Sequence, residues 1–119
     1  MDRKYNKRTV GSDYEQLAAE YLISKGHTII KRNFRTSYGE IDIISRDATT
    51  LVFTECKYRS NKKYGCAIEA VNLQKQRKIS RVALYFCTKY GYNDFPCRFD
   101  VIGIEDNNIT HIKNAFDYI

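Results

Sequence analysis

The sequence contains no apolar run that approaches the length of a membrane span. The N-terminal residues MDRKYNKRTV carry charge, but no hydrophobic segment follows them, so a signal peptide is not expected either. These two absences predict a cytoplasmic protein with no place in a membrane.

Paired cysteine motifs are also missing. The four cysteines show neither C-x-x-C pairs nor the histidine spacing of a zinc site. Because a cytoplasmic chain keeps its thiols reduced, disulfides are not expected. We interpret as core or neutral residues Cys56, Cys66, Cys87 and Cys97.

The chain is short, with 119 residues, and 43% of them are hydrophobic. This length and composition predict one soluble domain that buries its own core. We expect a mobile basic arm over residues 1–10 and a single domain over residues 11–119.

Apolar periodicity predicts an α/β fold with the order α-β-β-β-α-β-β. Ser12 and Glu15 resemble a capping box, which predicts a helix over about residues 13–25 that stops at Gly26. A second helix with an apolar stripe is expected over about 73–90. The strands are predicted over about residues 27–34, 39–45, 51–58, 97–104 and 108–112.

The segments GEIDII and LVFTECK combine strand alternation with charged residues. If their hairpin is symmetric about residues 48 and 49, Ser45 meets Val52 and Asp42 meets Glu55. Cross-strand neighbours have Cβ atoms roughly 5 Å apart, so the two carboxylates would repel each other unless a cation lies between them. Two carboxylates at this distance are the hard oxygen ligands that Mg²⁺ or Mn²⁺ prefers.

Lys57 follows Glu55 on the same strand face. It is placed to hold an attacking water or to stabilise charge that develops on a phosphate. The simpler alternative is a solvated sheet face with one exposed ion pair, which contributes little to stability. The triplet alone does not decide between the two.

Basic residues are concentrated between positions 57 and 81, where they face only Glu69, and the net charge is +6. A basic patch raises the local concentration of polyanions, so nucleic acid is the first partner to consider and an anionic membrane surface the second. The candidate nucleic-acid-binding residues are Arg35, Arg59, Lys62, Lys63, Lys75, Arg77 and Lys78. Of these, Lys75 has helical spacing from Ile79 and is expected to turn inward.

Taken together, the motifs resemble the YraN-like family of small bacterial proteins, in the restriction-endonuclease-like, or P-D…(D/E)-x-K, superfamily. This family is similar to archaeal Holliday-junction resolvases. The segments that carry the resemblance are GSDYEQLAAEYLISKGH, RNFRTSYGEIDII, LVFTECKYRS, EAVNLQKQRKI and RFDVIGI, which together extend over residues 11–104. Ile41 stands where the motif has proline.

The resemblance implies a mixed sheet flanked by helices and Mg²⁺-dependent hydrolysis of a nucleic-acid backbone. It makes Asp42 the metal-binding aspartate, Glu55 and Lys57 the E-x-K pair, and Glu15 the early helix acid. The predicted ligands of Mg²⁺ or Mn²⁺ are thus Asp42, Glu55 and the backbone carbonyl of Cys56, with Glu15 in the outer shell. DNA, branched DNA included, is the expected substrate, and a homodimer is expected by analogy with resolvases.

Two other functions fit the same residues. A non-catalytic nucleic-acid-binding module would lose affinity steeply with salt but would neither hydrolyse its ligand nor be stabilised by a divalent ion. An interaction protein with an acidic protein partner would not bind DNA.

Overall fold

The computed structural model describes the backbone of residues 7–59, 71–106 and 108–118 and the side chains of 13–58, 71–106 and 108–118. Within these ranges the elements are α1 (Lys7–Ser24), β1 (Thr28–Thr36), β2 (Gly39–Asp47), β3 (Thr50–Arg59), α2 (Leu73–Tyr90), β4 (Cys97–Glu105) and β5 (Asn108–Phe116). The predicted α-β-β-β-α-β-β order is confirmed. No helix in the described part is both long and apolar enough to cross a membrane.

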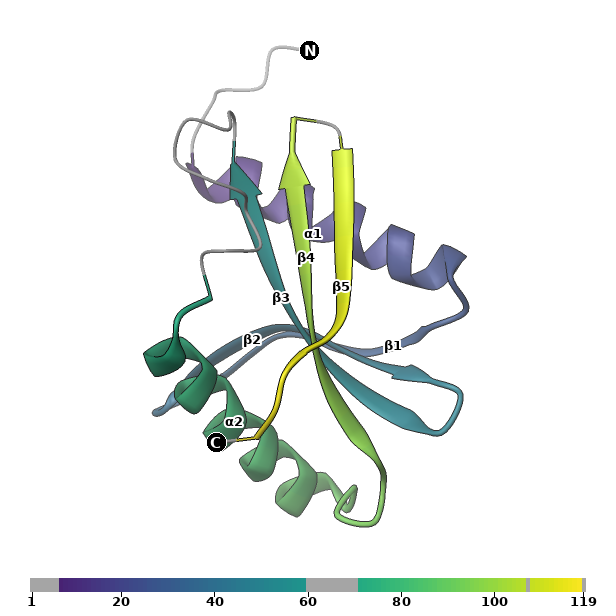
Figure 1. Cartoon of the computed structure of the whole chain (residues 1–119), viewed down its shortest axis with the longest axis vertical. Helices are drawn as coiled ribbons and strands as arrows, with labels where there is room; N and C mark the ends of the chain where they lie inside the picture. Colours follow the sequence, from purple (N-terminus) through teal and green to yellow (C-terminus); the bar gives the residue numbers. More distant parts are fainter. Residues whose placement is uncertain (1–6, 60–70, 107, 119) are drawn as a thin grey trace.

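The strands form one mixed sheet in the order β1-β2-β3-β4-β5. Neighbouring strands are antiparallel except β3 and β4, which run parallel and are joined through α2. Parallel neighbours need a long crossover, which explains why the second helix falls between them in the sequence. The sheet is strongly twisted, and α1 and α2 lie against it from opposite sides (Figure 1).

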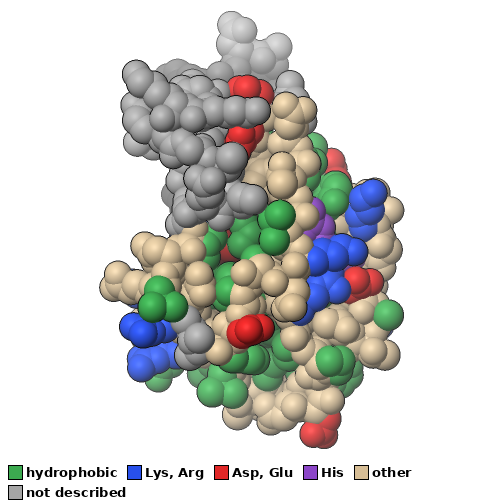
Figure 2. All heavy atoms as spheres, viewed as in Figure 1, with side chains coloured by type: hydrophobic (Ala, Val, Ile, Leu, Met, Phe, Trp, Pro, Cys, Tyr) green, Lys and Arg blue, Asp and Glu red, His purple; other side chains and the backbone are tan. Residues whose placement is uncertain are grey.

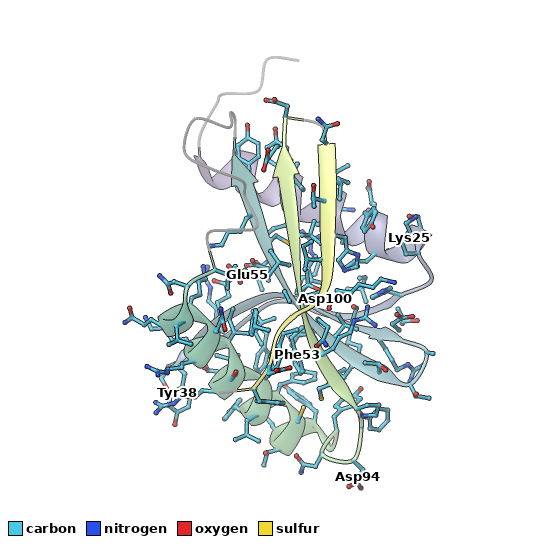
Figure 3. All side chains as sticks on the ribbon, in the orientation of Figure 1. Lys25, Tyr38, Phe53, Glu55, Asp94 and Asp100 are labelled. Carbon is cyan, nitrogen blue, oxygen red and sulfur yellow. The ribbon has the colours of Figure 1, made fainter. Side chains whose placement is uncertain are left out.

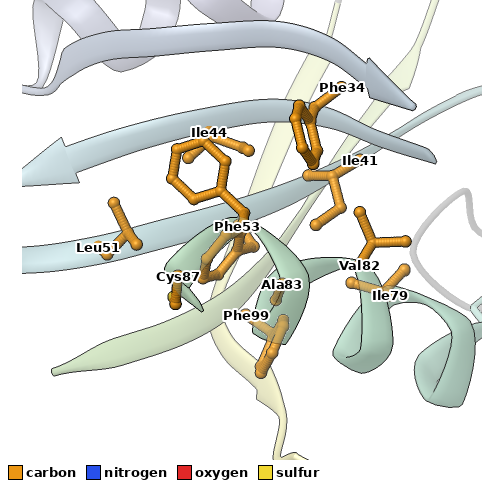
Figure 4. Packing of buried hydrophobic residues seen from close by; sticks show 11 residues of the cluster. Phe34, Ile41, Ile44, Leu51, Phe53, Ile79, Val82, Ala83, Cys87 and Phe99 are labelled. Carbon is orange, nitrogen blue, oxygen red and sulfur yellow. The ribbon is translucent and has the colours of Figure 1, made fainter. Parts of the chain in front are cut away.

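Each helix covers its own hydrophobic cluster. The cluster under α2 gathers aromatic and aliphatic residues of β2, β3 and β4 around Phe53, which stacks on Phe99 with ring centroids 5.6 Å apart (Figure 4). The cluster under α1 joins Ala18 and Leu22 to Ile43, Ile102 and others on the opposite face. Each helix therefore packs on one face of the sheet and buries the apolar side chains of that face.

The second helix has the predicted bounds because both of its ends are capped. Asn72 accepts a hydrogen bond from the backbone N–H of Lys75, and Gly91 follows the last turn with a φ of 78°. A side-chain oxygen at the N-cap and a left-handed glycine after the C-terminus are the usual stops of a helix.

The first helix differs from the prediction. It begins at Lys7, so Lys7–Val10 of the expected arm are helical and Ser12 lies within the helix. The predicted capping box of Ser12 and Glu15 is therefore wrong, because an N-cap residue stands outside the helical turns. Residues 1–6 of the expected arm lie outside the described residues.

The last strand extends to Phe116, four residues beyond its predicted end. Its register shifts near Asn114, whose φ is 54° and whose N–H donates to the carboxylate of Asp100 at 3.0 Å. Beyond this irregularity, Phe116 stacks on Phe99 at 5.0 Å. A buried carboxylate on β4 thus holds in place the residues that lie beyond the predicted end of the last strand.

A buried polar network lies beside these strands. Arg98 pairs with Asp100, two residues further along β4, at 3.0 Å, and Asp100, in the middle of Figure 3, also contacts the Nε2 atom of His111 at 2.7 Å. The Nδ1 atom of His27 lies 2.9 Å from the hydroxyl of Ser45. Paired groups of this kind are tolerated in a core because their hydrogen bonds are satisfied.

Acid should weaken the fold through His27. Burial lowers the pKa of this imidazole, although the nearby charge of Asp47 raises it. The folded state therefore binds the proton less readily than the unfolded state, so the stabilisation is present above the ordinary pKa of 6.5 and is lost as pH falls below it. We expect Tm to drop by roughly a few degrees between pH 7.5 and 5.5, and by less in His27→Gln, as measured by circular dichroism. An equal drop in the variant would contradict this role.

Candidate metal and phosphate site

The site begins where β2 and β3 stop pairing. The predicted hairpin register is confirmed for Ser45 with Val52, but the ladder ends at Ile43 and Thr54, one pair before Asp42 and Glu55. The Oδ2 atom of Asp42 instead accepts the backbone N–H of Cys56 at 2.9 Å. The predicted direct cross-strand pair of carboxylates is therefore replaced by a side-chain bond to the neighbouring strand.

This bond places Asp42 between two hollows. The first, of about 310 Å³, lies toward α1 and is lined by Glu15, Glu40, Asp42 and Lys57 among others. The second, of about 390 Å³, is lined by Asp42 and Glu55 together with α2 residues, which include Lys75. One aspartate thus faces both the acids of one hollow and the lysine of the other.

Three carboxylates meet in the first hollow. One carboxylate oxygen from each of Glu15, Glu40 and Asp42 lies within 4.8 Å of the others. Glu15 comes from α1, whereas Glu40 and Asp42 stand two residues apart on β2, so that strand alternation directs them to the same side. The described part of the chain here offers a set of hard oxygen ligands of the kind that Mg²⁺ and Mn²⁺ prefer.

Asn33 connects two of these acids. With its amide nitrogen turned toward them, it donates to Glu15 at 2.7 Å and to Glu40 at 3.0 Å. Its φ is 53°, a left-handed conformation that asparagine adopts more readily than most residues. This local backbone conformation of β1 brings the amide to the two carboxylates.

The electrostatics of the acids are unfavourable without a cation. Burial, followed by the negative charge of Glu55, raises the pKa of Asp42 to about 8, although the hydrogen bond from Cys56 opposes this. Burial and the charge of Glu40 raise the pKa of Glu15 as well. Carboxylates that resist ionisation near one another are a signature of functional sites, because a bound cation would relieve the repulsion.

Glu55 lies between two lysines. Only 5% of its surface is exposed, and its Oε1 atom contacts Lys75 at 2.7 Å and Lys57 at 3.4 Å. In Figure 3 it sits between the sheet and the beginning of α2. The predicted inward turn of Lys75 is thus seen directly.

The two lysines differ electrostatically. Burial and the proximity of Lys75 lower the pKa of Lys57. For Lys75, burial is the largest single effect and lowers the pKa, but the hydrogen bonds to Glu55 and Lys57 and the charges of Glu55 and Asp42 together raise it above its ordinary value. The side chain of Lys57 is only 15% exposed, so the alternative of a solvated sheet face with an exposed ion pair does not describe this residue.

The predicted site residues therefore divide into two groups. Asp42 lies with Glu15 and Glu40, while Glu55 contacts Lys57 and Lys75. Glu40 shares the strand face of Asp42, so alternation pointed to it as a further ligand, but a glutamate at the start of a strand is usually exposed and the predicted ligands did not include it. A ligand role for Glu55 and for the carbonyl of Cys56 stays a prediction.

The predicted nucleic-acid-binding residues are more scattered. Arg35 stands at the first hollow and pairs with Glu40 at 3.1 Å. Arg77 and Lys78 line a hollow on α2 with Arg81, and Tyr38 lies in the same wall, beside α2 in Figure 3. Blue side chains over α2 are visible at the lower left of Figure 2. Outside the described residues lie Lys62, Lys63 and the side chain of Arg59.

Comparison with known proteins gives a family. The model of the uncharacterised protein family UPF0102 matches residues 14–104. A UPF0102 protein of Thermodesulfovibrio yellowstonii is 45% identical over 107 residues, which cover 90% of this chain and 95% of the relative. A UPF0102 protein of Clostridioides difficile is 42% identical over 113 residues, covering 93% of this chain and 99% of the relative. The matched range contains the acids, the lysines and the hairpin that joins them, and the chain belongs to the UPF0102 family.

Proposed function

We propose that this protein is a metal-dependent nuclease that hydrolyses phosphodiester bonds of nucleic acid, with DNA as the expected substrate. The observation that carries the proposal is the meeting of Glu15, Glu40 and Asp42 beside a nearly buried lysine, Lys57, on the adjoining strand. The mixed sheet with one helix on each face fits the restriction-endonuclease-like superfamily that the sequence resembles.

The carboxylates would hold the metal. Asp42 is oriented by the N–H of Cys56, and Glu15 and Glu40 are oriented by the amide of Asn33. The three carboxylates are therefore preorganised before a metal binds. A divalent ion at such a site neutralises charge on a phosphate and lowers the pKa of a bound water.

Lys57 would provide the positive charge next to the acids. It lines the same hollow as Asp42 and is held by Glu55, so its ammonium group is placed to hold the attacking water or to stabilise the phosphate oxygens. The contacts of Glu55 favour a positioning role, because its carboxylate already contacts both Lys57 and Lys75. Lys75 is the more exposed of the two lysines and is placed to contact the nucleic-acid backbone.

The basic hollow on α2 would bind phosphates away from the cut bond. Each phosphate contact that is lost should reduce the slope of log K against log salt by about 0.9 for duplex DNA. We therefore expect the double variant Arg77→Ala/Arg81→Ala to bind DNA more weakly and with a slope smaller by about 1 to 2, as measured by fluorescence anisotropy in EDTA. Lys25→Ala/Lys31→Ala, which removes two positive charges at exposed positions outside α2, is the charge-matched control and should keep the parent's slope. An unchanged slope in the double variant would place the phosphates elsewhere.

The direct test of the proposed activity uses labelled branched, duplex and single-stranded DNA with Mg²⁺, with Mn²⁺ and with EDTA. We expect cleavage with either ion and none in EDTA. No product from any substrate with either ion would reject the nuclease. Paired cuts in a junction would require two copies of the chain, so a homodimer remains an expectation. A cytoplasmic location also remains an expectation.

A further inference from the structure

Two tyrosines form an aromatic wall in the hollow that holds the three acids. Tyr14 of α1 and Tyr58 of β3 stack with ring centroids 3.8 Å apart and an interplanar angle of 16°. Both are half-buried and both line the hollow of about 310 Å³ together with Arg35. Aromatic rings, an arginine and a carboxylate cluster therefore share one space.

Both tyrosines are close in sequence to residues that belong to the acid cluster or bind it. Tyr14 directly precedes Glu15, and Tyr58 lies two residues beyond Cys56, whose N–H binds Asp42. Two residues of a strand span roughly 6.6 Å, so the backbone of Tyr58 lies about that far from the amide that binds Asp42, and both rings line the same hollow as the carboxylates. A phosphate at the acids would bring its neighbouring base to the tyrosines.

The residues of the wall match a nucleobase better than a bare phosphate. Phosphates need only positive charge, whereas an aromatic ring offers a face on which any base can stack. The tyrosines also pack against the core under α1, but that packing alone would not require them to line an open hollow beside the acids.

We infer that this hollow accepts the unpaired base of the nucleotide next to the bond that is cut, so that the substrate is a strand with unpaired nucleotides rather than continuous duplex. The inference rests on the proposed function for the nature of the ligand. A base within a duplex is stacked and paired on its neighbours, and it must be flipped out before it can enter such a pocket.

The test measures stacking without cleavage. An oligonucleotide that contains 2-aminopurine, whose fluorescence falls when the base stacks, is titrated with the protein in EDTA, first as a single strand and then within a duplex. We expect quenching and tighter binding for the single strand only. Tyr14→Leu and Tyr58→Leu should each lose the quenching and bind about tenfold more weakly, whereas Tyr58→Phe, which keeps the ring, should behave like the parent.

Tyr118→Leu is the matched control, because Tyr118 is exposed but does not line this hollow. If the parent protein quenches 2-aminopurine equally in the duplex and in the single strand, the inference is overturned, whether or not the variants fold. Unchanged quenching in both leucine variants, when they are folded, would overturn it as well. Because no metal is present, the outcome is separate from that of the cleavage test. Quenching without any cleavage would reject the nuclease alone, and cleavage with no strand preference in quenching would reject the stacking alone.

Discussion

Lys57→Ala should cleave DNA at least about 100-fold more slowly than the parent, because it removes a charged donor from the position where negative charge develops. Removing a single preorganised donor of this kind typically slows an enzyme by about 10²–10³-fold. The effect should be large here, since Lys57 is nearly buried and bulk water cannot readily replace it. The measurement is the single-turnover rate with Mn²⁺ at saturating protein.

The same variant should keep its affinity for DNA within a few-fold, because binding comes mainly from exposed basic residues elsewhere. Lys31→Ala removes an equal charge from an exposed position on β1 and should cleave at the parent's rate. If Lys57→Ala cuts as fast as the parent, the assignment of Lys57 to the reaction is wrong, whatever the metal dependence. Circular dichroism shows whether the variant is folded.

Much of this arrangement could be predicted from the sequence because it depends on local patterns. Asn72, the apolar stripe through Ile79 and Phe86, and Gly91 determine α2 within its own segment. The two-residue turn after Asp47 likewise determines the register that brings Asp42 to β3. Patterns of this kind depend on backbone geometry alone, and a single sequence displays them.

The start of α1 could not be predicted in the same way. Residues 7–12 have no apolar periodicity, and Ser12 followed by Glu15 imitates a cap inside what is one continuous helix. The local signal was therefore misleading, and only the whole structure shows where the helix begins.

The meeting of Glu15 with Glu40 could not be predicted from local patterns either. Glu15 and Glu40 meet because α1 packs across the sheet and because Asn33 takes a left-handed φ, neither of which a pattern of alternation contains. The ladder also ends one pair early, which turns Asp42 toward Cys56 and leaves Glu55 to the lysines. The predicted residues lie together, but their pairing is set by long-range packing.

A divalent ion should stabilise the parent strongly. With Mn²⁺ at 100 times its Kd, linkage adds about 2.7 kcal/mol to the free energy of unfolding, which for a chain of this size raises Tm by on the order of 10 °C. Glu40→Gln and Asp42→Asn should lose most of this shift, because each removes one charged ligand. Differential scanning fluorimetry with Mn²⁺ and with EDTA measures it.

For Asp42→Asn, the difference in stability from the parent should change sign between EDTA and Mn²⁺. A general loss of stability would lower the variant's stability under both conditions. Its amide oxygen can still accept the N–H of Cys56, so the strand contact is kept. The pKa of Asp42, raised to about 8, means that the favourable protonated form is present at low pH and is lost as pH rises through that value. In EDTA at pH 8.5 the variant should therefore be more stable than the parent, and with Mn²⁺ it should be less stable. A parent whose Tm does not respond to Mn²⁺ at any pH would reject the ion site and would leave a non-catalytic nucleic-acid-binding module as the better account of the basic surface.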